Sequence, residues 1–133
     1  MKNTSIIIAD SEYLIRVGLR HVLENQPTYK IVSEVVNEES LFYELATKQT
    51  DIIVMDYNQP GAFTTATVDK LKKEFPKVKL LVISGDDDKK NIYQVLEKGV
   101  SSYLSKRCDE KEIINAIRAT SSNEKYYLSL IHI

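Results

Sequence analysis

The sequence predicts an α/β fold, a three-layer sandwich in which a five-stranded parallel sheet lies between two layers of helices. Three runs of four apolar residues, at positions 6–9, 52–55 and 80–83, are typical of strands buried on both faces, as in a parallel sheet. Between these runs the apolar residues follow the spacing of a helix. A chain of 133 residues is long enough for one domain with a full core and too short for two domains of ordinary size.

Two further strands are predicted at residues 29–36 and 101–104. Both segments carry more polar residues than the other three strands, and Ser33 and Glu34 lie inside the first of them. Strands at the edge of a sheet tolerate such residues because one side of the strand faces solvent. We therefore expect these two strands to be the edges of the sheet.

Five helices are predicted from apolar residues that recur at intervals of three and four. Their apolar positions, in chain order, are Ile15, Leu19, Val22 and Leu23; Leu41, Phe42, Leu45 and Ala46; Val68, Leu71 and Phe75; Ile92, Val95 and Leu96; and Ile113, Ile114 and Ile117. Each helix follows one predicted strand, so the chain is expected to form five strand–helix units.

Several of these helices have recognisable ends. Side chains of Asn, Ser, Thr and Asp accept hydrogen bonds from the free N–H groups of a first helical turn, whereas Pro and Gly interrupt a helix. The predicted caps are Asn37 or Ser40 for the second helix, Thr64 or Thr65 for the third and Asp109 for the fifth, and the predicted stops are Pro76 and Gly99. The acidic run at 86–88 is expected to cap the fourth helix with solvated charge.

Composition limits the classes of function. With 18 basic and 19 acidic residues the formal net charge is −1, too small to draw the whole chain onto nucleic acid or an anionic membrane. Cys108 is the only cysteine, so no intrachain disulfide can form, as is usual in a reducing cytoplasm. No apolar run approaches the ~18 residues of a membrane span, and residues 1–5 leave no room for a signal peptide. We expect a cytoplasmic protein.

Four polar residues each follow a predicted strand: Asp10, Asp56, Ser84 and Lys106. The carboxyl ends of parallel strands lie along one edge of a sheet, and ligands bind there where the strand order reverses. Two carboxylates, a hydroxyl and an ammonium are therefore expected to meet at one site. This set suits a phosphoryl group, which one carboxylate can receive while lysine and a metal neutralise its charge.

These residues stand in motifs that resemble the receiver domain of bacterial two-component response regulators. The motifs are Asp10, residues 56–61 (Asp-Tyr-Asn-Gln-Pro-Gly), residues 84–85 (Ser-Gly) and residues 103–106 (Tyr-Leu-Ser-Lys). Residues 16–20, 116–119 and 127–129 further resemble the NarL/LuxR-type subgroup, whose receivers precede a helix-turn-helix DNA-binding domain.

The resemblance implies the flavodoxin-like (CheY-like) sheet order 2-1-3-4-5. It places the receiver domain at residues 1–122 and makes residues 123–133 a C-terminal extension, or the start of a linker to an output domain that this chain lacks. DNA would be bound only through that output domain. A sensor histidine kinase is the implied partner, and a homodimer is possible.

The resemblance also implies roles for the site residues. Asp56 would be the phosphoacceptor, attacking a phosphohistidine or a small phosphodonor, with no enzymatic activity beyond phosphorylation and dephosphorylation of Asp56 itself. Asp10, Asp56 and the backbone carbonyl of Asn58 would bind Mg²⁺, and Lys106 would help to offset the added charge.

The resemblance implies a conformational switch as well. Ser84 would bond a phosphoryl oxygen, and the aromatic ring of Tyr103 would turn inward when Ser84 moves. A plainer interpretation exists for each site residue: Asp56 can cap the turn after its strand, Ser84 can end a strand, Lys106 can lie on the surface, and Tyr103 can be a half-buried edge aromatic. The two histidines, His21 and His132, lack partners at metal-ligand spacing.

The sequence departs from the family pattern in two places. Receivers usually carry two adjacent acids after the first strand, but Asp10 is followed by Ser11 and only then by Glu12. A hydroxyl is a poorer Mg²⁺ ligand than a carboxylate, so we expect weak Mg²⁺ binding unless the longer Glu12 side chain reaches the site instead of pointing to solvent. The second departure is at residues 62–64 (Ala-Phe-Thr), where we expect a differently shaped loop.

Three functions fit these observations. The first is a phosphorylatable receiver that relays a kinase signal to an output domain, and the second is a degenerate receiver that acts as an interaction or dimerisation module without phosphorylation. Ser11 is the residue that separates them. The third, a small flavodoxin-like enzyme, requires a phosphate-binding loop after the first strand, yet residues 10–13 (Asp-Ser-Glu-Tyr) offer acids and no glycine.

Overall fold

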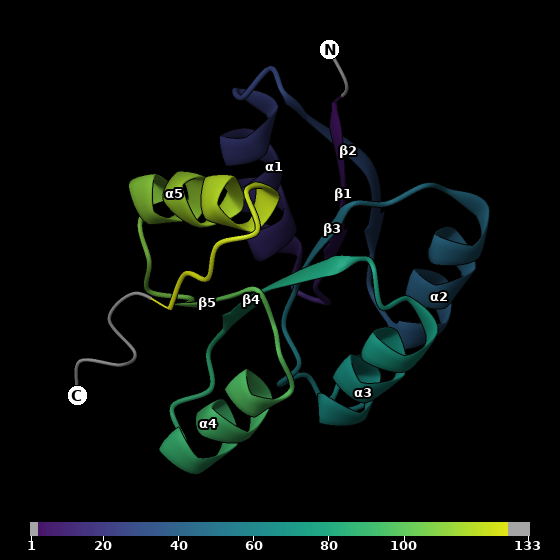
Figure 1. The fold of residues 1–133 in the computed structure, drawn as a ribbon, viewed down its shortest axis with the longest axis vertical. Helices are drawn as coiled ribbons and strands as arrows, with labels where there is room; N and C mark the ends of the chain where they lie inside the picture. Colours follow the sequence, from purple (N-terminus) through teal and green to yellow (C-terminus); the bar gives the residue numbers. More distant parts are fainter. Residues whose placement is uncertain (1–2, 128–133) are drawn as a thin grey trace.

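A computed structural model describes residues 3–127 and contains one five-stranded parallel sheet (Figure 1). The strands are β1 (Thr4–Ala9), β2 (Tyr29–Val35), β3 (Ile52–Met55), β4 (Lys79–Ser84) and β5 (Ser102–Ser105). Their order in the sheet is β2-β1-β3-β4-β5, as the resemblance implied, and the two predicted edge strands do lie at the edges. The sheet order reverses between β1 and β3, which places a crevice at their carboxyl ends.

Helices cover both faces of the sheet, which confirms the three-layer sandwich. They are α1 (Tyr13–Glu24), α2 (Glu38–Thr47), α3 (Thr65–Glu74), α4 (Lys89–Glu97) and α5 (Glu110–Ser121). Alternate residues of each central strand point to opposite faces: Ile7 and Ile53 pack with residues of α2, α3 and α4, whereas Ile8 and Val54 pack with residues of α1 and α5. All four of these side chains are buried, so the strands are apolar on both sides.

Side chains cap the helices largely as expected. Asn37 Oδ1 accepts a hydrogen bond from the Ser40 N–H at 2.8 Å, and Asp88 Oδ1 accepts one from the Lys90 N–H at 3.0 Å. At α5 the Asp109 carboxylate accepts from the Glu112 N–H at 2.8 Å, while the Glu112 carboxylate accepts from the Asp109 N–H at 3.2 Å. This reciprocal capping box fixes the start of α5 directly after the β5 loop.

The segment after α5 returns to the sheet and runs beside β5. The Tyr103 N–H donates to the Tyr126 carbonyl at 2.8 Å, and the Tyr126 N–H donates to the Ser101 carbonyl at 3.3 Å. The Tyr127 hydroxyl donates to the Val100 carbonyl at 2.7 Å, and its ring packs against the core on the α2–α3–α4 side. Residues 128–133, which include His132 and part of the predicted extension and subgroup motif, lie outside the described residues.

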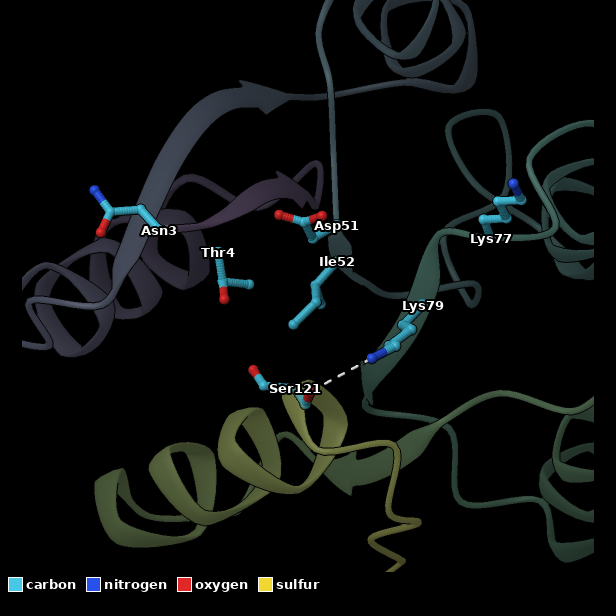
Figure 2. A pocket seen from close by; sticks show the side chains of 7 residues that line it. All are labelled: Asn3, Thr4, Asp51, Ile52, Lys77, Lys79 and Ser121. Carbon is cyan, nitrogen blue, oxygen red and sulfur yellow. Dashed lines mark hydrogen bonds between the residues drawn. The ribbon is translucent and has the colours of Figure 1, made fainter. Parts of the chain in front are cut away.

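A polar pocket opens at the amino-terminal edge of the sheet, the edge opposite to the predicted site (Figure 2). Its volume is about 230 Å³, and Asp51, Lys79 and Ser121 are among its lining residues. Lys79 Nζ donates to the Ser121 carbonyl at 3.4 Å, and Asp51 Oδ2 accepts from the Ser5 N–H at 2.8 Å. These two charged groups therefore bond backbone atoms at the pocket. No helix within residues 3–127 is long and apolar enough to cross a membrane.

Candidate functional site

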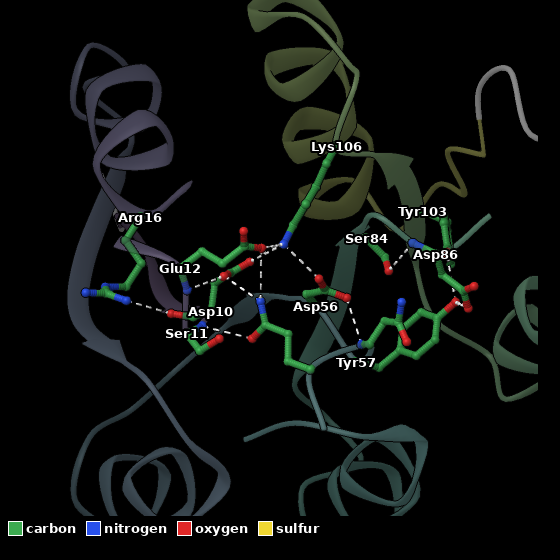
Figure 3. A network of polar contacts seen from close by, with 12 residues as sticks. Asp10, Ser11, Glu12, Arg16, Asp56, Tyr57, Ser84, Asp86, Tyr103 and Lys106 are labelled. Carbon is green, nitrogen blue, oxygen red and sulfur yellow. Dashed lines mark hydrogen bonds and ion pairs between the residues drawn. The ribbon is translucent and has the colours of Figure 1, made fainter. Parts of the chain in front are cut away.

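Three strands deliver charged side chains to one point at the carboxyl edge of the sheet (Figure 3). Asp10 follows β1, Asp56 follows β3 and Lys106 follows β5, and both aspartates are only 2% exposed. Lys106 Nζ lies 2.8 Å from Asp56 Oδ2 and 3.2 Å from Asp10 Oδ2, and it also bonds the Glu12 carboxylate. The structure thus brings together the predicted acids and the predicted lysine.

The charges in this site do not balance, because three carboxylates face the one ammonium of Lys106. Burial alone would lower the pKa of Lys106, but its bonds to Asp56 and Glu12 raise that pKa above its ordinary value. The bond to Lys106 lowers the pKa of the Glu12 carboxyl. Both shifts favour the charged forms of Lys106 and Glu12, and three carboxyl groups around one ammonium favour the binding of a further cation.

The geometry also fits a divalent cation. Asp10, Glu12 and Asp56 each offer a carboxylate oxygen, and these three oxygens lie within 4.8 Å of one another. Mg²⁺ is bound by oxygen ligands at about 2.0–2.1 Å, so an ion between these oxygens could reach all three after small adjustments. Glu12 supplies the third carboxylate that Ser11 lacks, although its side chain is 58% exposed. The site residues therefore fit the metal that receivers use.

The two aspartates also hold the loops that follow their strands. Asp10 Oδ1 accepts from the Glu12 N–H, and Asp56 Oδ1 accepts from the Asn58 N–H, both at 2.8 Å. The plainer interpretation of Asp56, as a cap for the next turn, is thus correct for one oxygen, while the other oxygen faces Lys106. Each carboxylate is fixed in orientation by its own loop, which holds the remaining oxygen in the site.

Ser84 and Tyr103 belong to a second polar network beside the first (Figure 3). Both side chains are fully buried, and Ser84 Oγ accepts from the Asp86 N–H at 3.1 Å. The Tyr103 hydroxyl lies 2.7 Å from the Tyr57 hydroxyl, which in turn donates to Asp86 Oδ2 at 2.7 Å. Tyr103 is therefore not a half-buried edge aromatic: its ring already points inward. Burial raises its pKa to about 12.

Sequence reasoning missed the role of Gln59. Its side chain is 8% exposed, with Oε1 accepting from the Ser11 N–H at 2.8 Å and Nε2 donating to Asp10 Oδ1 at 2.7 Å. Gln59 reaches this place because its backbone forms a bridge with Phe63, which is fully buried. The one available signal was a polar residue beside Pro60 in the loop that follows Asp56.

Fold and site together define a class of protein. The family described as "Response regulator receiver domain" matches residues 6–118, and the chain belongs to it. Its relatives are NarL/LuxR-family regulators. The chain is 30% identical over 121 residues to the transcriptional regulatory protein DegU of Brevibacillus brevis, and 25% identical over 122 residues to the response regulator protein VraR of Staphylococcus aureus.

These matches cover 91% and 92% of this chain but 51% and 58% of DegU and VraR, so the chain spans little more than half the length of either relative. Among solved structures, the isolated receiver domain of RcsB from Salmonella enterica, in the presence of phosphomimetic BeF₃⁻, is similar with a TM-score of 0.91 and 20% identity. That similarity covers 98% of this chain and 96% of the RcsB chain. It supports the same fold.

Proposed function

We propose that this chain is a phosphoacceptor receiver domain that accepts a phosphoryl group on Asp56 from a sensor histidine kinase. The observation that carries the proposal is the place of Asp56: its carboxylate is buried, bonds Lys106 at 2.8 Å and faces the carboxylates of Asp10 and Glu12. A nucleophile, a fixed ammonium and a cluster of metal-ligating oxygens are what phosphoryl transfer requires, because that reaction depends mainly on position and charge.

In the proposed reaction an Asp56 carboxylate oxygen attacks the phosphorus of a phosphohistidine. A new P–O bond forms while the P–N bond breaks, and its electron pair leaves with the imidazole nitrogen, which takes up a proton. Lys106 stabilises the charge that gathers on the phosphoryl oxygens and on Asp56. Asp10, Asp56 and the Asn58 carbonyl, with Glu12 as a further ligand, would hold Mg²⁺, which would supply the rest of the neutralising charge.

The signal would leave the site through Ser84 and Tyr103. Ser84 is the last residue of β4, and we propose that its hydroxyl turns from the Asp86 N–H to a phosphoryl oxygen on Asp56. Because Tyr103 is bonded to Tyr57 and, through it, to Asp86, a shift of the β4–α4 loop would change the environment of this ring. The face formed by α4, β5 and α5 would then repack.

The relatives support a wider role in gene regulation. DegU is a transcriptional regulatory protein, and RcsB has been solved as dimers bound to DNA. We propose that residues 1–122 are the receiver, that residues 123–133 begin a link to a transcriptional output domain, and that DNA is bound only through that domain. We further propose that the protein forms a homodimer, as RcsB has been solved as dimers, and that it acts in the cytoplasm.

A phosphorylation-independent interaction module is the second candidate, and Ser11 favours it. Ser11 brings no carboxylate to the site, and its N–H is already bonded by Gln59. The two candidates are separated by incubating the protein with acetyl phosphate and Mg²⁺ and measuring its intact mass, beside an Asp56→Asn control. A phosphoryl adduct that is absent from the control is the expected result. Absence of any adduct, together with no Mg²⁺ binding by titration, would leave the interaction module.

A further inference from the structure

The Gln59 side chain lies between the backbone of Ser11 and the carboxylates of the site. Its Nε2 donates to Asp10 Oδ1 at 2.7 Å and lies 3.4 Å from Glu12 Oε1. Its Oε1 accepts from the Ser11 N–H at 2.8 Å. The oxygen of the amide is therefore bonded to the loop after β1. Its NH₂ group is bonded to two of the three carboxylates that would hold a metal ion.

The orientation of this amide is fixed by its partners. A backbone N–H can only donate, so the Gln59 atom that faces Ser11 must be the oxygen. The NH₂ group must then face Asp10 and Glu12, whose carboxylates can only accept. The backbone of Gln59 is held as well, because its N–H donates to the Phe63 carbonyl at 3.1 Å and its carbonyl accepts from the Phe63 N–H at 2.8 Å. The amide therefore cannot exchange the positions of its oxygen and nitrogen, and the backbone of the turn is held in place by Phe63.

A cation and this NH₂ group need the same oxygens. Asp10 Oδ1 already accepts from the Glu12 N–H and from Gln59 Nε2, which uses both lone pairs of that oxygen. Asp10 Oδ2 faces Lys106 at 3.2 Å. A cation at Oδ1 must displace one of these two bonds, and the bond from Gln59 is the one made by a side chain. A cation at Oδ2 must lie close to the partial positive charge of the same NH₂ group.

We propose that Gln59 is a positioning residue that competes with the divalent cation for Asp10 and Glu12 and so sets the metal affinity of the receiver. The proposal rests on the proposed function, since it concerns the same metal site. Gln59 lies outside the acidic cluster, and in this proposal it lowers the Mg²⁺ affinity in addition to the loss of a carboxylate at Ser11. Removing the amide should therefore tighten metal binding without adding any ligand.

Two variants test this. Gln59→Met keeps an unbranched side chain of similar length but has no amide, and Gln59→Glu keeps an oxygen for the Ser11 N–H while replacing the NH₂ group by a carboxylate oxygen. Gln94→Met, at an exposed position of α4, is the matched control. The Mg²⁺ dissociation constant is measured by isothermal titration calorimetry, with Mn²⁺ binding followed by electron paramagnetic resonance as a second probe, and circular dichroism verifies folding.

We expect Gln59→Met to bind Mg²⁺ about fivefold more tightly than the natural chain, which is the effect of removing one competing hydrogen bond. Gln59→Glu should bind more tightly still and should melt at a lower temperature in EDTA, because its new carboxylate faces Asp10 when no cation is present. Gln94→Met should change neither quantity. Equal or weaker Mg²⁺ binding by Gln59→Met, with the fold intact, would overturn the proposal.

Phosphorylation is measured separately, so the two proposals can fail independently. If the natural chain forms an adduct on Asp56 and Gln59→Met binds Mg²⁺ no more tightly, the receiver function stands and the role of Gln59 is wrong. If the natural chain forms no adduct but Gln59→Met binds Mg²⁺ more tightly, the role of Gln59 stands and the receiver function is wrong. If neither chain binds Mg²⁺, the role of Gln59 is wrong too.

Discussion

The hydroxyl groups of Tyr57 and Tyr103 lie 2.7 Å apart inside the protein, and the two rings meet edge to face with centroids 6.1 Å apart. Tyr57 has one hydroxyl proton and donates it to Asp86, so Tyr103 must be the donor between the two tyrosines. Asp86 also accepts from the Asp88 N–H, directly before α4. A chain of hydrogen bonds thus connects Tyr103 on β5 to the start of α4, and it passes through Tyr57, the residue directly after Asp56.

Replacing Tyr57 by phenylalanine should break this connection. The Tyr103 hydroxyl would lose its acceptor and Asp86 would lose a donor, so we expect the free energy of unfolding to fall by about 2 kcal/mol. Urea unfolding monitored by circular dichroism measures the change. Tyr93→Phe, at an exposed ring of α4, is the control and should have almost no effect. Equal stability of both variants would show that the buried hydroxyl pair contributes nothing.

Replacing Lys106 by methionine should destabilise the metal-free protein. The change leaves the buried carboxylates of Asp10 and Asp56 without their ammonium, and breaking a buried ion pair costs about 3 kcal/mol. Mg²⁺ should restore part of the loss because it supplies the missing positive charge. Thermal unfolding in EDTA and in Mg²⁺ measures both effects.

The matched control for this change is Lys98→Met, which breaks a pair with Asp69 on the surface. That pair should contribute less than about 1 kcal/mol. A Lys106→Met protein that unfolds in EDTA at the same temperature as the natural chain would contradict the electrostatic account of the site.

Replacing Ser11 by aspartate should tighten Mg²⁺ binding. A carboxylate at ~4 Å from a cation adds an attraction of order 1 kcal/mol even in a water-like medium, which corresponds to about a fivefold smaller dissociation constant. Isothermal titration calorimetry measures it, with Ser11→Asn as a control of similar size but no charge. Unchanged affinity in Ser11→Asp would mean that Glu12 already supplies the third carboxylate.

The Cys108 thiol should react slowly with alkylating reagents, although Cys108 lies in a loop. Burial raises its pKa to about 11, so the protonated form dominates at neutral pH and the reactive thiolate appears only as the pH rises toward that value. At pH 8 we expect alkylation by iodoacetamide to be about two orders of magnitude slower than for an ordinary cysteine of pKa ~8.5. Mass spectrometry between pH 7 and pH 10 measures the rate, and the urea-unfolded protein is the control. A rate that levels off near pH 9 would contradict the prediction.

The apolar pattern was enough to predict the three central strands, because each is a short apolar run that is buried on both faces, while the two edge strands were recognised by their more polar composition. The ends of the strands were less accurate. Strand β1 begins at Thr4 and β4 extends to Ser84, since backbone hydrogen bonds between strands continue past the last apolar side chain. The strand order came from family resemblance, because no periodicity in the chain specifies which strands become neighbours.

The charged site was predictable for a similar reason: a residue that directly follows a parallel strand must lie at the sheet edge. Contacts that depend on loop shape were not. The prediction that residues 86–88 cap the fourth helix is confirmed for Asp88, but Asp86 instead bonds the Tyr57 hydroxyl across the sheet edge. Gln59 was missed because its direction is set by the turn closed with Phe63, and nothing in the sequence specifies how that turn folds.

The return of the chain to β5 has a consequence for self-association. An edge strand presents unpaired N–H and C=O groups, and a strand from another molecule can add to them. The Tyr103 N–H on β5 and the carbonyl of Ser101, directly before β5, are already bonded to Tyr126 of the same chain. A second molecule that pairs with these two groups must first displace Tyr126, so the protein's own backbone protects this part of the sheet edge from pairing between molecules.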